Sequence, residues 1–542
     1  MVDLAAEIRR AAPRASGALL AAALLLSGCT TSLSQWWHNG WKVGPQYCPP
    51  GATYADKWVD AADKRVKSEP AQDCAWWTVF NDSTLNMLVE KAYQQNLDLK
   101  AAGARILESR AQRNIAFGNL FPQSQTAQAD YVHGQLSKNL GLPLPSNTLN
   151  VWADGFNLSW ELDFWGRYRR SVEGAEADLD ASVESYGDSL VMLLSEVATN
   201  YVQMRTYEQR LAYARQNVIV QQRSLGLAEV RFRNGRGTEL DVRQARSSVS
   251  QTESLIPPLI TGRRQAANQL CTLLGVPVAN LADELQSAPI PNAPVDVAIG
   301  IPADLLRRRP DIRRAERQVA AQSARVGVAE ADLYPRFSLN GFVGFVADDF
   351  KDLFNSKSFT GVFFPTMQWN VLNYGRIRNN IKVQDKRLEA ATLQYQQSVL
   401  TAGREVEDAL TAFLQAQQQA LYLEQTVVDA QRSVELVQMQ FETGVVDFNR
   451  VYNTQTTLLN AQDQLATTRG NIDLQLIQVY KALGGGWVCF LDGCGMPRFD
   501  SASVTAAPDA PGPPAVPAPA PLTVPAAPNL PASDDKRPAD SK

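Results

Sequence analysis

The sequence predicts a membrane protein of mixed α/β class, in which two copies of one unit each join a pair of strands to a very long helix. Three observations predict this fold class. A heptad pattern of apolar residues continues from Val399 to Phe441, the same pattern occurs earlier in the chain, and alternating apolar and polar residues precede each copy.

The heptad pattern indicates one uninterrupted helix. Positions seven residues apart are all apolar or small, and so are the positions three residues after them. The first set comprises Val399, Val406, Phe413, Ala420, Val427, Val434 and Phe441. Proline is absent from Ile377 to Phe441. A helix over 375–441 would therefore be a rod of roughly 100 Å, at about 1.5 Å per residue.

The same stripe occurs 209 residues earlier, which indicates an internal duplication. Its positions are Leu190, Val197, Met204, Leu211, Val218, Leu225 and Phe232. Shorter helices over 96–120 and 309–333 are related by an offset of 213 residues. The offset thus falls from 213 to 209 residues, so a loop between these regions is four residues longer in the first copy. Loops tolerate such changes in length best.

Between these helices the period changes from that of a helix to that of a strand. Apolar residues from Phe156 to Phe164 alternate with polar ones, and similar segments cover 337–345 and 363–371, with a weaker one at about 123–133. Strands cross a membrane only as a closed barrel, and small barrels need about eight strands. Four strands therefore require either a packed soluble core or several chains that share one barrel.

The ends of the rods carry turn residues. Gly166 and Gly375 follow an aromatic residue at each strand-to-helix corner, and Gly235 and Gly444 follow the rods. Thr238 and Asp447 are good N-caps, and they predict that a second helix returns antiparallel to each rod. Pro257-Pro258 predicts a kink or break in the first return helix.

Composition excludes several classes of function. The 542 residues carry a net charge of −4, so no basic surface predicts a nucleic-acid partner. There is no phosphate-binding loop, no GxSxG nucleophile motif and no His–carboxylate cluster. With two histidines and no CxxC pair, the sequence predicts no metal site, no cofactor and no enzyme.

The N-terminus resembles a bacterial lipoprotein signal. The apolar run 15–28 is too short to span a membrane and follows three arginines. It ends in Leu26-Ser27-Gly28-Cys29, which resembles a lipobox whose Cys29 would carry lipid, and Thr30 is compatible with the outer membrane. The alternative is an ordinary signal peptide with an incidental cysteine.

The cysteines fit an oxidising compartment. Cys489 and Cys494 are near enough in sequence to close a small loop, and Cys48 could pair with Cys74 across an irregular segment. Cys271 lies in a helical apolar context, which predicts a buried thiol.

Together these motifs are similar to the TolC-type outer-membrane factors, in the lipoprotein branch of OprM- and NodT-like efflux proteins. The resemblance covers about Trp76 to Trp487. Besides the lipobox, it is carried by Trp76-Trp77, Phe80-Asn81-Asp82, Leu162-Asp163-Phe164-Trp165-Gly166-Arg167, Arg309-Pro310-Asp311-Ile312, the Phe-x-x-Gly helix ends and Leu483-Gly484-Gly485-Gly486-Trp487.

The resemblance implies a homotrimer, lipid-anchored in the cell outer membrane. Four strands from each chain would form one β-barrel continuous with an α-helical barrel in the periplasm, with an equatorial domain around its middle. The implied partners are a periplasmic adaptor, an inner-membrane RND-type pump and outer-membrane lipid. The implied function is a passive exit duct for drugs or other small molecules.

The expected organisation follows from these assignments. It consists of a signal peptide (1–28), an extended segment from the lipid anchor (29–80), first-repeat helices (81–122), strand pair (123–165) and long hairpin (166–275), an equatorial linker (276–308), a second-repeat helix (309–335), strand pair (336–374) and long hairpin (375–484), an equatorial C-terminal segment (485–500) and a disordered Pro/Ala-rich tail (501–542).

Candidate site residues are charged and lie at the hairpin turns and in the strands. Arg236, Asp241, Asp447 and Arg450 are candidates for a periplasmic constriction, where carboxylates near the axis would be held by arginine pairs. Glu161 and Asp163 are candidates for lining the barrel lumen.

Two other functions remain open from the sequence. One is the exit channel of a type I protein secretion system with the same fold. The other is a periplasmic coiled-coil lipoprotein that spans no membrane, against which the alternating strands argue.

Overall fold

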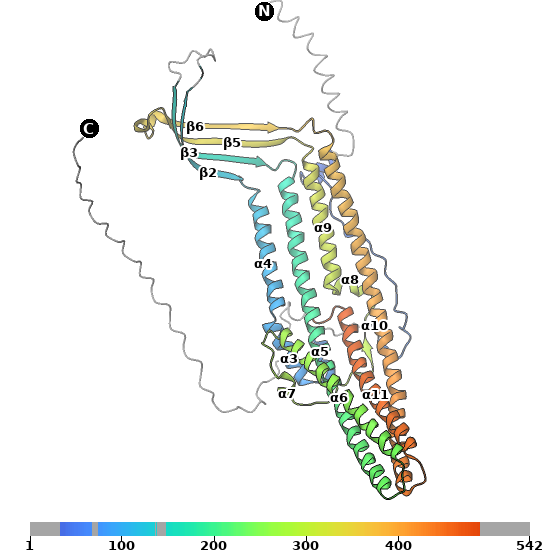
Figure 1. The fold of residues 1–542 in the computed structure, drawn as a ribbon. Coiled ribbons are helices and arrows are strands. Elements are labelled where there is room, and N and C mark those ends of the chain that lie inside the picture. Colours follow the sequence, from blue (N-terminus) through green and yellow to red (C-terminus); the bar gives the residue numbers. More distant parts are fainter. Residues whose placement is uncertain (1–32, 68–73, 136, 138–147, 488–542) are drawn as a thin grey trace, which may run out of the picture. The chain divides into compact units, whose positions relative to one another are not determined.

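The computed structural model describes residues 33–67, 74–135, 137 and 148–487 (Figure 1). Long helices, several short ones and a four-stranded sheet make up most of the regular structure. In chain order the main elements are α2 (Leu33–His38), β1 (Val66–Lys67), α3 (Ser83–Gln95), α4 (Leu97–Gly118), β2 (Ser124–Gln135), β3 (Thr148–Leu162), α5 (Arg167–Arg233), α6 (Glu239–Leu273), α7 (Leu281–Glu284), β4 (Val297–Ala298), α8 (Leu305–Arg308), α9 (Pro310–Ala331), β5 (Arg336–Ala347), β6 (Phe359–Gln368), α10 (Arg376–Thr443) and α11 (Phe448–Ala482).

The two predicted rods are α5 and α10, of 67 and 68 residues. Each is followed by a return helix of 35 residues, α6 and α11 respectively, which packs along it (Figure 1). The helical hairpins expected from the sequence are therefore present in both repeats.

The heptad seam explains why α10 stays continuous. Its seam faces α11 and α9, and most of its positions are buried within this single chain. The buried seam residues are Val399, Ala402, Val406, Ala409, Phe413, Ala420, Ala430, Val434 and Phe441. Small side chains at this seam allow close approach between helices, so packing rather than helix propensity stabilises so long a rod.

Glycine sets the corners at which strands become rods. Gly166 and Gly375 cap α5 and α10 with φ of 81° and 80°, a left-handed conformation that other residues adopt at a cost. Gly444 ends α10 in the same region, with φ of 82°. These conformations confirm the corner and stop positions that the sequence predicts.

Of the predicted kink or break at Pro257-Pro258, the break does not occur, because α6 continues through both prolines. The two rings remove the amide donors for the carbonyls of Glu253 and Ser254. All four residues are exposed, so water can reach the freed carbonyl groups. The hydroxyl of Thr261 donates to the carbonyl of Pro257 and adds a local bond (3.0 Å).

The strands form one antiparallel sheet in the order β2-β3-β5-β6. Gly155 of β3 pairs with Gly344 of β5, within the register that joins the two repeats. The last strand of each repeat ends earlier than the alternation suggests, at Leu162 and Gln368, so Phe164, Trp369 and Val371 lie beyond the strands. At the first corner the Asp163 carboxylate accepts hydrogen bonds from the amides of Tyr168 and Arg169, which turns the chain into α5.

The main core lies where α3, α5, α9, α10 and α11 meet. The N-terminal segment, expected to be extended, contains α2 and contributes β1, which pairs with β4 of the linker between the repeats. Among the described residues, no helix has both the length and the apolar character of a membrane span.

Candidate functional site

The turns of the two long hairpins carry the predicted constriction residues. Asp241 completes a capping box: its carboxylate accepts the Thr238 amide (2.9 Å) and its own amide donates to the Thr238 hydroxyl (3.2 Å). Asp447 caps α11 by accepting the amide of Arg450 (3.2 Å). Both carboxylates therefore stabilise helix starts, whatever else they do.

The structure brings three of the four predicted residues together. Arg236, Asp241 and Asp447 line one small pocket of about 300 Å³ between the two turns, whereas Arg450 lies outside it. Within the described part of the chain, none of the four forms an ion pair, and both arginines are exposed. Both arginine side chains therefore face solvent in the single chain.

Arg231 also lies at the hairpin turns, although it is not among the site residues predicted from the sequence. Its Nη1 donates to the main-chain carbonyl of Phe441, near the end of α10, and its Nη2 lies 3.4 Å from the carbonyl of Arg236. The guanidinium also sits 4.6 Å from the centre of the Phe441 ring. One side chain of the first hairpin thereby holds the end of the second rod.

A small apolar cluster supports this contact. The Phe441 ring meets the Phe448 ring edge to face, with centroids 5.6 Å apart, and both are buried together with Ala228 and Val242. The matching residue of the first repeat, Phe232, is 45% exposed. The duplicated rods therefore end differently: Arg231 of the first hairpin binds the end of the second rod, whereas Phe232 at the end of the first rod stays partly exposed.

One face of the sheet is mainly apolar, and the other is mixed, with a row of polar side chains beside Phe342 and Phe364. The apolar face includes Phe156 and Phe363, which are more than half exposed, and a concavity of about 730 Å³ over Gly341 and Gly361. On the other face, side chains hydrogen-bond from strand to strand. Asn157 donates to Gln128 (2.7 Å), Ser159 donates to Asn340 (2.8 Å), and Asn340 donates to Thr366 (2.9 Å). This polar ladder crosses all four strands.

The two predicted lumen residues differ in their surroundings. Glu161 lies on the polar face of β3, in the same alternation as Asn157 and Ser159, and approaches Arg167 at 3.6 Å. Asp163 lies at the corner, where its carboxylate pairs with Arg169 (2.9 Å) besides capping α5. The side chain of Asp163 is therefore committed to the corner, and Glu161 is the better placed of the two to meet water inside a barrel.

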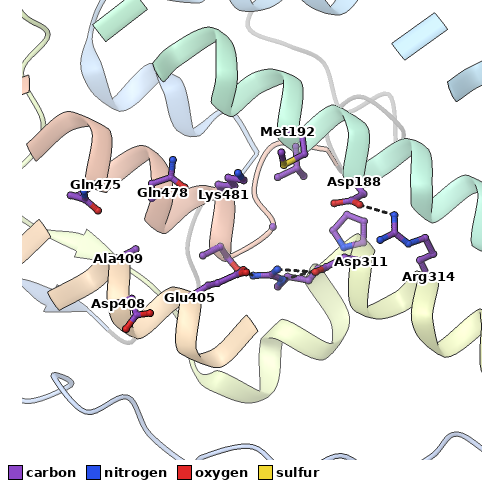
Figure 2. Close-up of a pocket in the computed structure, with 15 residues that line it drawn as sticks. Asp188, Met192, Asp311, Arg314, Glu405, Asp408, Ala409, Gln475, Gln478 and Lys481 are labelled. Carbon is purple, nitrogen blue, oxygen red and sulfur yellow. Dashed lines mark hydrogen bonds and ion pairs between the residues drawn. The ribbon is translucent and has the colours of Figure 1, made fainter. Parts of the chain in front are cut away.

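A charged cluster fixes the helices halfway along the second rod. Arg309 bonds Asp311 (2.8 Å) at the start of α9, Glu405 of α10 (2.8 Å) and the carbonyl of Ala482 in α11 (2.8 Å). A cavity of about 520 Å³ opens beside it, where Asp188 also pairs with Arg314 (Figure 2). One buried arginine thus ties three helices together.

Arg309 also stabilises the charged form of Asp311. Burial by itself would raise the pKa of Asp311, but the hydrogen bonds and charge of Arg309 outweigh burial and hold that pKa below its ordinary value. The cluster includes Arg309-Pro310-Asp311, a motif singled out in the sequence.

The cysteine pairing predicted for Cys48 and Cys74 is wrong. Cys48 is a free, exposed thiol, while Cys74 is disulfide-bonded, and a sulfur atom that is already bonded cannot join a second bridge. Cys271 is a free, buried thiol, as predicted. Cys29, Cys489 and Cys494 lie outside the described residues.

Comparison with known families identifies the chain. The family model of the outer membrane efflux protein matches residues 88–276 and 301–485. The two matched segments start 213 residues apart and end 209 apart, the same offsets that relate the repeats. The family match therefore follows the internal duplication.

Individual relatives agree with the family match. "Nodulation protein T" of Rhizobium leguminosarum bv. trifolii is 31% identical, over 83% of this chain and 91% of its own length. "Pyoverdine export outer membrane protein OpmQ" of Pseudomonas putida is 32% identical, over 78% of this chain and 90% of its own length. "Cation efflux system protein CusC" of Escherichia coli is 27% identical, over 86% of this chain and 97% of its own length.

Solved structures confirm the predicted fold class. The outer-membrane channel OprN is 31% identical and superposes with a TM-score of 0.78, over 82% of this chain and 99% of that one. The open state of the MtrE outer membrane channel of Neisseria gonorrhoeae is 25% identical, with a TM-score of 0.73 over 82% of this chain and 98% of that one. The chain therefore belongs to the outer membrane efflux protein family and is the outer-membrane channel component of an efflux pump.

Proposed function

We propose that three copies of this chain form one passive duct through which small molecules or ions leave the cell. The observation that carries the proposal is the sheet with an apolar face, a hydrogen-bonded polar face and open edges at β2 and β6. Four strands are too few to close a membrane barrel, which needs about eight or more, so the edges require strands from other copies.

The two faces of the sheet suit opposite surroundings. In a barrel shared by three chains, Phe156 and Phe363 would meet lipid, and the ladder from Gln128 to Thr366 would meet water in the duct. The long hairpins would continue the duct through the periplasm. Transport then needs no covalent chemistry in this chain, and the energy comes from a partner.

The partners we propose are a periplasmic adaptor and an inner-membrane pump of the RND type. Relatives named for pyoverdine export, cation efflux and toluene efflux support a cargo of small molecules or ions. A wide, water-filled duct selects weakly, so the pump would choose the cargo.

We also propose that Cys29 carries a lipid that anchors the N-terminus in the outer membrane. The motif Leu26-Ser27-Gly28-Cys29 supports the modification. Mass analysis of the N-terminal peptide of the mature protein tests it, with a diacylglyceryl-modified Cys29 as the expected result and an unmodified thiol as the contrary one.

The periplasmic end of the duct is the proposed constriction. Arg236, Asp241 and Asp447 gather at one pocket between the turns, and Arg450 lies on the first turn of α11. In a ring of three copies the carboxylates would repeat around the axis, where they would repel anions and attract cations.

Reconstitution in a planar lipid bilayer tests the proposed duct. The full-length protein should give discrete conductance steps that are absent with detergent alone and with heat-denatured protein. Chemical cross-linking of the same preparation should stop at three copies. Cross-linked trimers without conductance would favour a scaffold that spans no membrane, and monomers without conductance would contradict the shared barrel.

A further inference from the structure

Five aromatic rings gather at the first strand-to-helix corner, and most come from the N-terminal segment. We call this group the corner cluster: Trp36, Trp37, Trp41, Phe164 and Trp165. The Trp36 ring stacks on Trp41 with centroids 5.6 Å apart and lies 5.3 Å from Phe164. Trp37 packs against Trp41 at 5.7 Å.

The outer rings of the corner cluster are uncovered in the single chain. Trp37 is 64% exposed, Trp41 46% and Phe164 41%. Three adjacent rings of this size form an apolar patch of the kind that marks an interaction surface. The patch is held in position, because hydrogen bonds fix the N-terminal segment that carries two of its rings.

Arg169 provides most of these bonds. It donates to the carbonyls of Gly40 (2.6 Å) and Trp41 (2.8 Å), and its Nε donates to Asp163 (2.9 Å). The amide of Val43 donates to the carbonyl of Trp165 (3.0 Å). The N-terminal segment is thereby docked on the corner with its tryptophan rings held in place.

The corner cluster is continuous with the apolar face of the sheet. The Phe164 ring meets the ring of Phe337, on the apolar face of β5, at 5.6 Å. The cluster lies at the end of the sheet where β3 passes into the long helix α5. In an outer-membrane channel whose long helices extend into the periplasm, this end is the boundary between lipid and periplasm.

Tryptophan is well suited to that boundary. Its ring is large and apolar, while its indole N–H can bond to water or lipid head groups, and for this reason tryptophan is enriched at membrane interfaces. The chain outside the described residues points to the same occupant. Cys29 precedes Leu33 by four residues, which can span at most about 14 Å.

We propose that the corner cluster docks on the periplasmic leaflet of the outer membrane, with Trp37 and Trp41 inserted at the level of the lipid head groups. The occupant is the phospholipid surface. This placement rests on the proposed barrel, and it gives the proposed lipid on Cys29 a fixed point of entry close to the sheet.

Quenching by brominated lipid tests the docking surface. The full-length protein is placed in phosphatidylcholine nanodiscs, with or without lipids that carry bromine near the glycerol, and its tryptophan fluorescence is measured. Trp37→Phe and Trp41→Phe should each reduce the intensity that bromine quenches, because each removes an emitter in contact with lipid. Both side chains are exposed, so neither change should disturb folding.

Trp77→Phe is the matched control, because Trp77 is buried in the main helical core. The change should lower the emission that bromine does not quench, and it should leave unchanged the intensity that bromine does quench. If Trp37→Phe and Trp41→Phe behave like Trp77→Phe, the surface does not meet lipid and the proposal is wrong. A lower thermal midpoint of the trimer in both variants would then identify a neighbouring copy as the occupant. Mass analysis of Cys29 and bilayer conductance report on the anchor and the duct separately.

Discussion

Arg231 of α5 donates a hydrogen bond to the main-chain carbonyl of Phe441, so the end of one repeat's rod is held by the other repeat. The guanidinium also covers the ring of Phe441. These contacts join the two hairpin turns within one subunit, next to the residues proposed to form the constriction.

Arg231→Ala should loosen the periplasmic end of the duct. The change removes a charged hydrogen bond and a cation–π contact, which together contribute about 2 kcal/mol. We expect a larger mean conductance in planar bilayers. The control is Arg233→Ala, since Arg233 is exposed and bonds to the carbonyl of Glu229 in its own helix. Equal conductance in the two variants would show that the contact does not restrain the turns.

Asp447 offers a way to separate the charge of the constriction from helix capping. Asp447→Ala removes both the charge and the cap of α11, whereas Asp447→Asn retains a capping oxygen. If the charge restricts the duct, both variants should leak in bilayers and lose preference for cations, whereas Arg450→Ala, which removes a positive charge, should leak without that loss. If only Asp447→Ala leaks, the capping bond matters and the charge does not. Unchanged conductance in all three would refute the constriction.

Arg309 should be the most sensitive residue of the charged cluster. Arg309→Ala leaves Asp311 without its partner and cuts the bonds to α10 and α11, so the free energy of unfolding should fall by about 3 kcal/mol. The thermal midpoint measures the effect. Arg404→Ala is the control: it breaks an exposed pair with Asp408 and should change stability by less than about 1 kcal/mol. Similar losses in both variants would argue against the cluster.

Asp473 predicts a pH dependence of stability. Burial raises the pKa of this carboxyl well above its ordinary value of 3.8, although a hydrogen bond from the Ala293 amide opposes the shift. The folded chain therefore keeps a proton that the unfolded chain loses, so this contribution to stability is complete below pH 3.8 and declines as the pH rises toward the folded pKa.

Asp473→Asn should accordingly reduce the loss of thermal midpoint as the pH rises above 3.8, because asparagine has no proton to lose. Asp429→Asn, at an exposed position on α10, should follow the wild type. A wild-type pH profile retained in Asp473→Asn would contradict the assignment.

The small residues of the α10 seam should be intolerant of larger ones. Ala409 is buried and Ala416 is half-buried, so leucine at both positions would overfill the contact between the helices of one subunit. We expect Ala409→Leu/Ala416→Leu to splay the helices and weaken the trimer. Ala390→Leu, at an exposed position on the same helix, is the control. A normal trimer of the double variant on native gels would refute the prediction.

The sequence predicts the rods and strands well because their patterns are local. The α10 helix begins one residue after Gly375 and ends one residue before Gly444, at the glycines that the sequence marks as corner and stop. Alternation locates the four strands, but it extends past their ends, since Asp163 redirects the backbone through bonds that alternation does not encode.

Contacts between distant residues escape the same reasoning. Arg231 meets a residue 210 positions away, and nothing in its neighbourhood distinguishes it from Arg233. The pairing of Cys48 with Cys74 is wrong for a similar reason, because two cysteines that flank an irregular segment need not meet in the fold. The prolines of α6 are tolerated because that face of the helix is exposed, which also depends on packing.

The N-terminal segment also changes the symmetry of the molecule. Duplication gives two corners of nearly equal backbone, at Gly166 and Gly375, but only the first is covered by the rings of Trp36 and its neighbours. Tyr374 at the second corner is 94% exposed. A ring of three subunits would thus have six corners of similar backbone geometry, in which corners covered by aromatic rings alternate with bare ones. A partner that recognises the bare corner would therefore bind three times per ring rather than six.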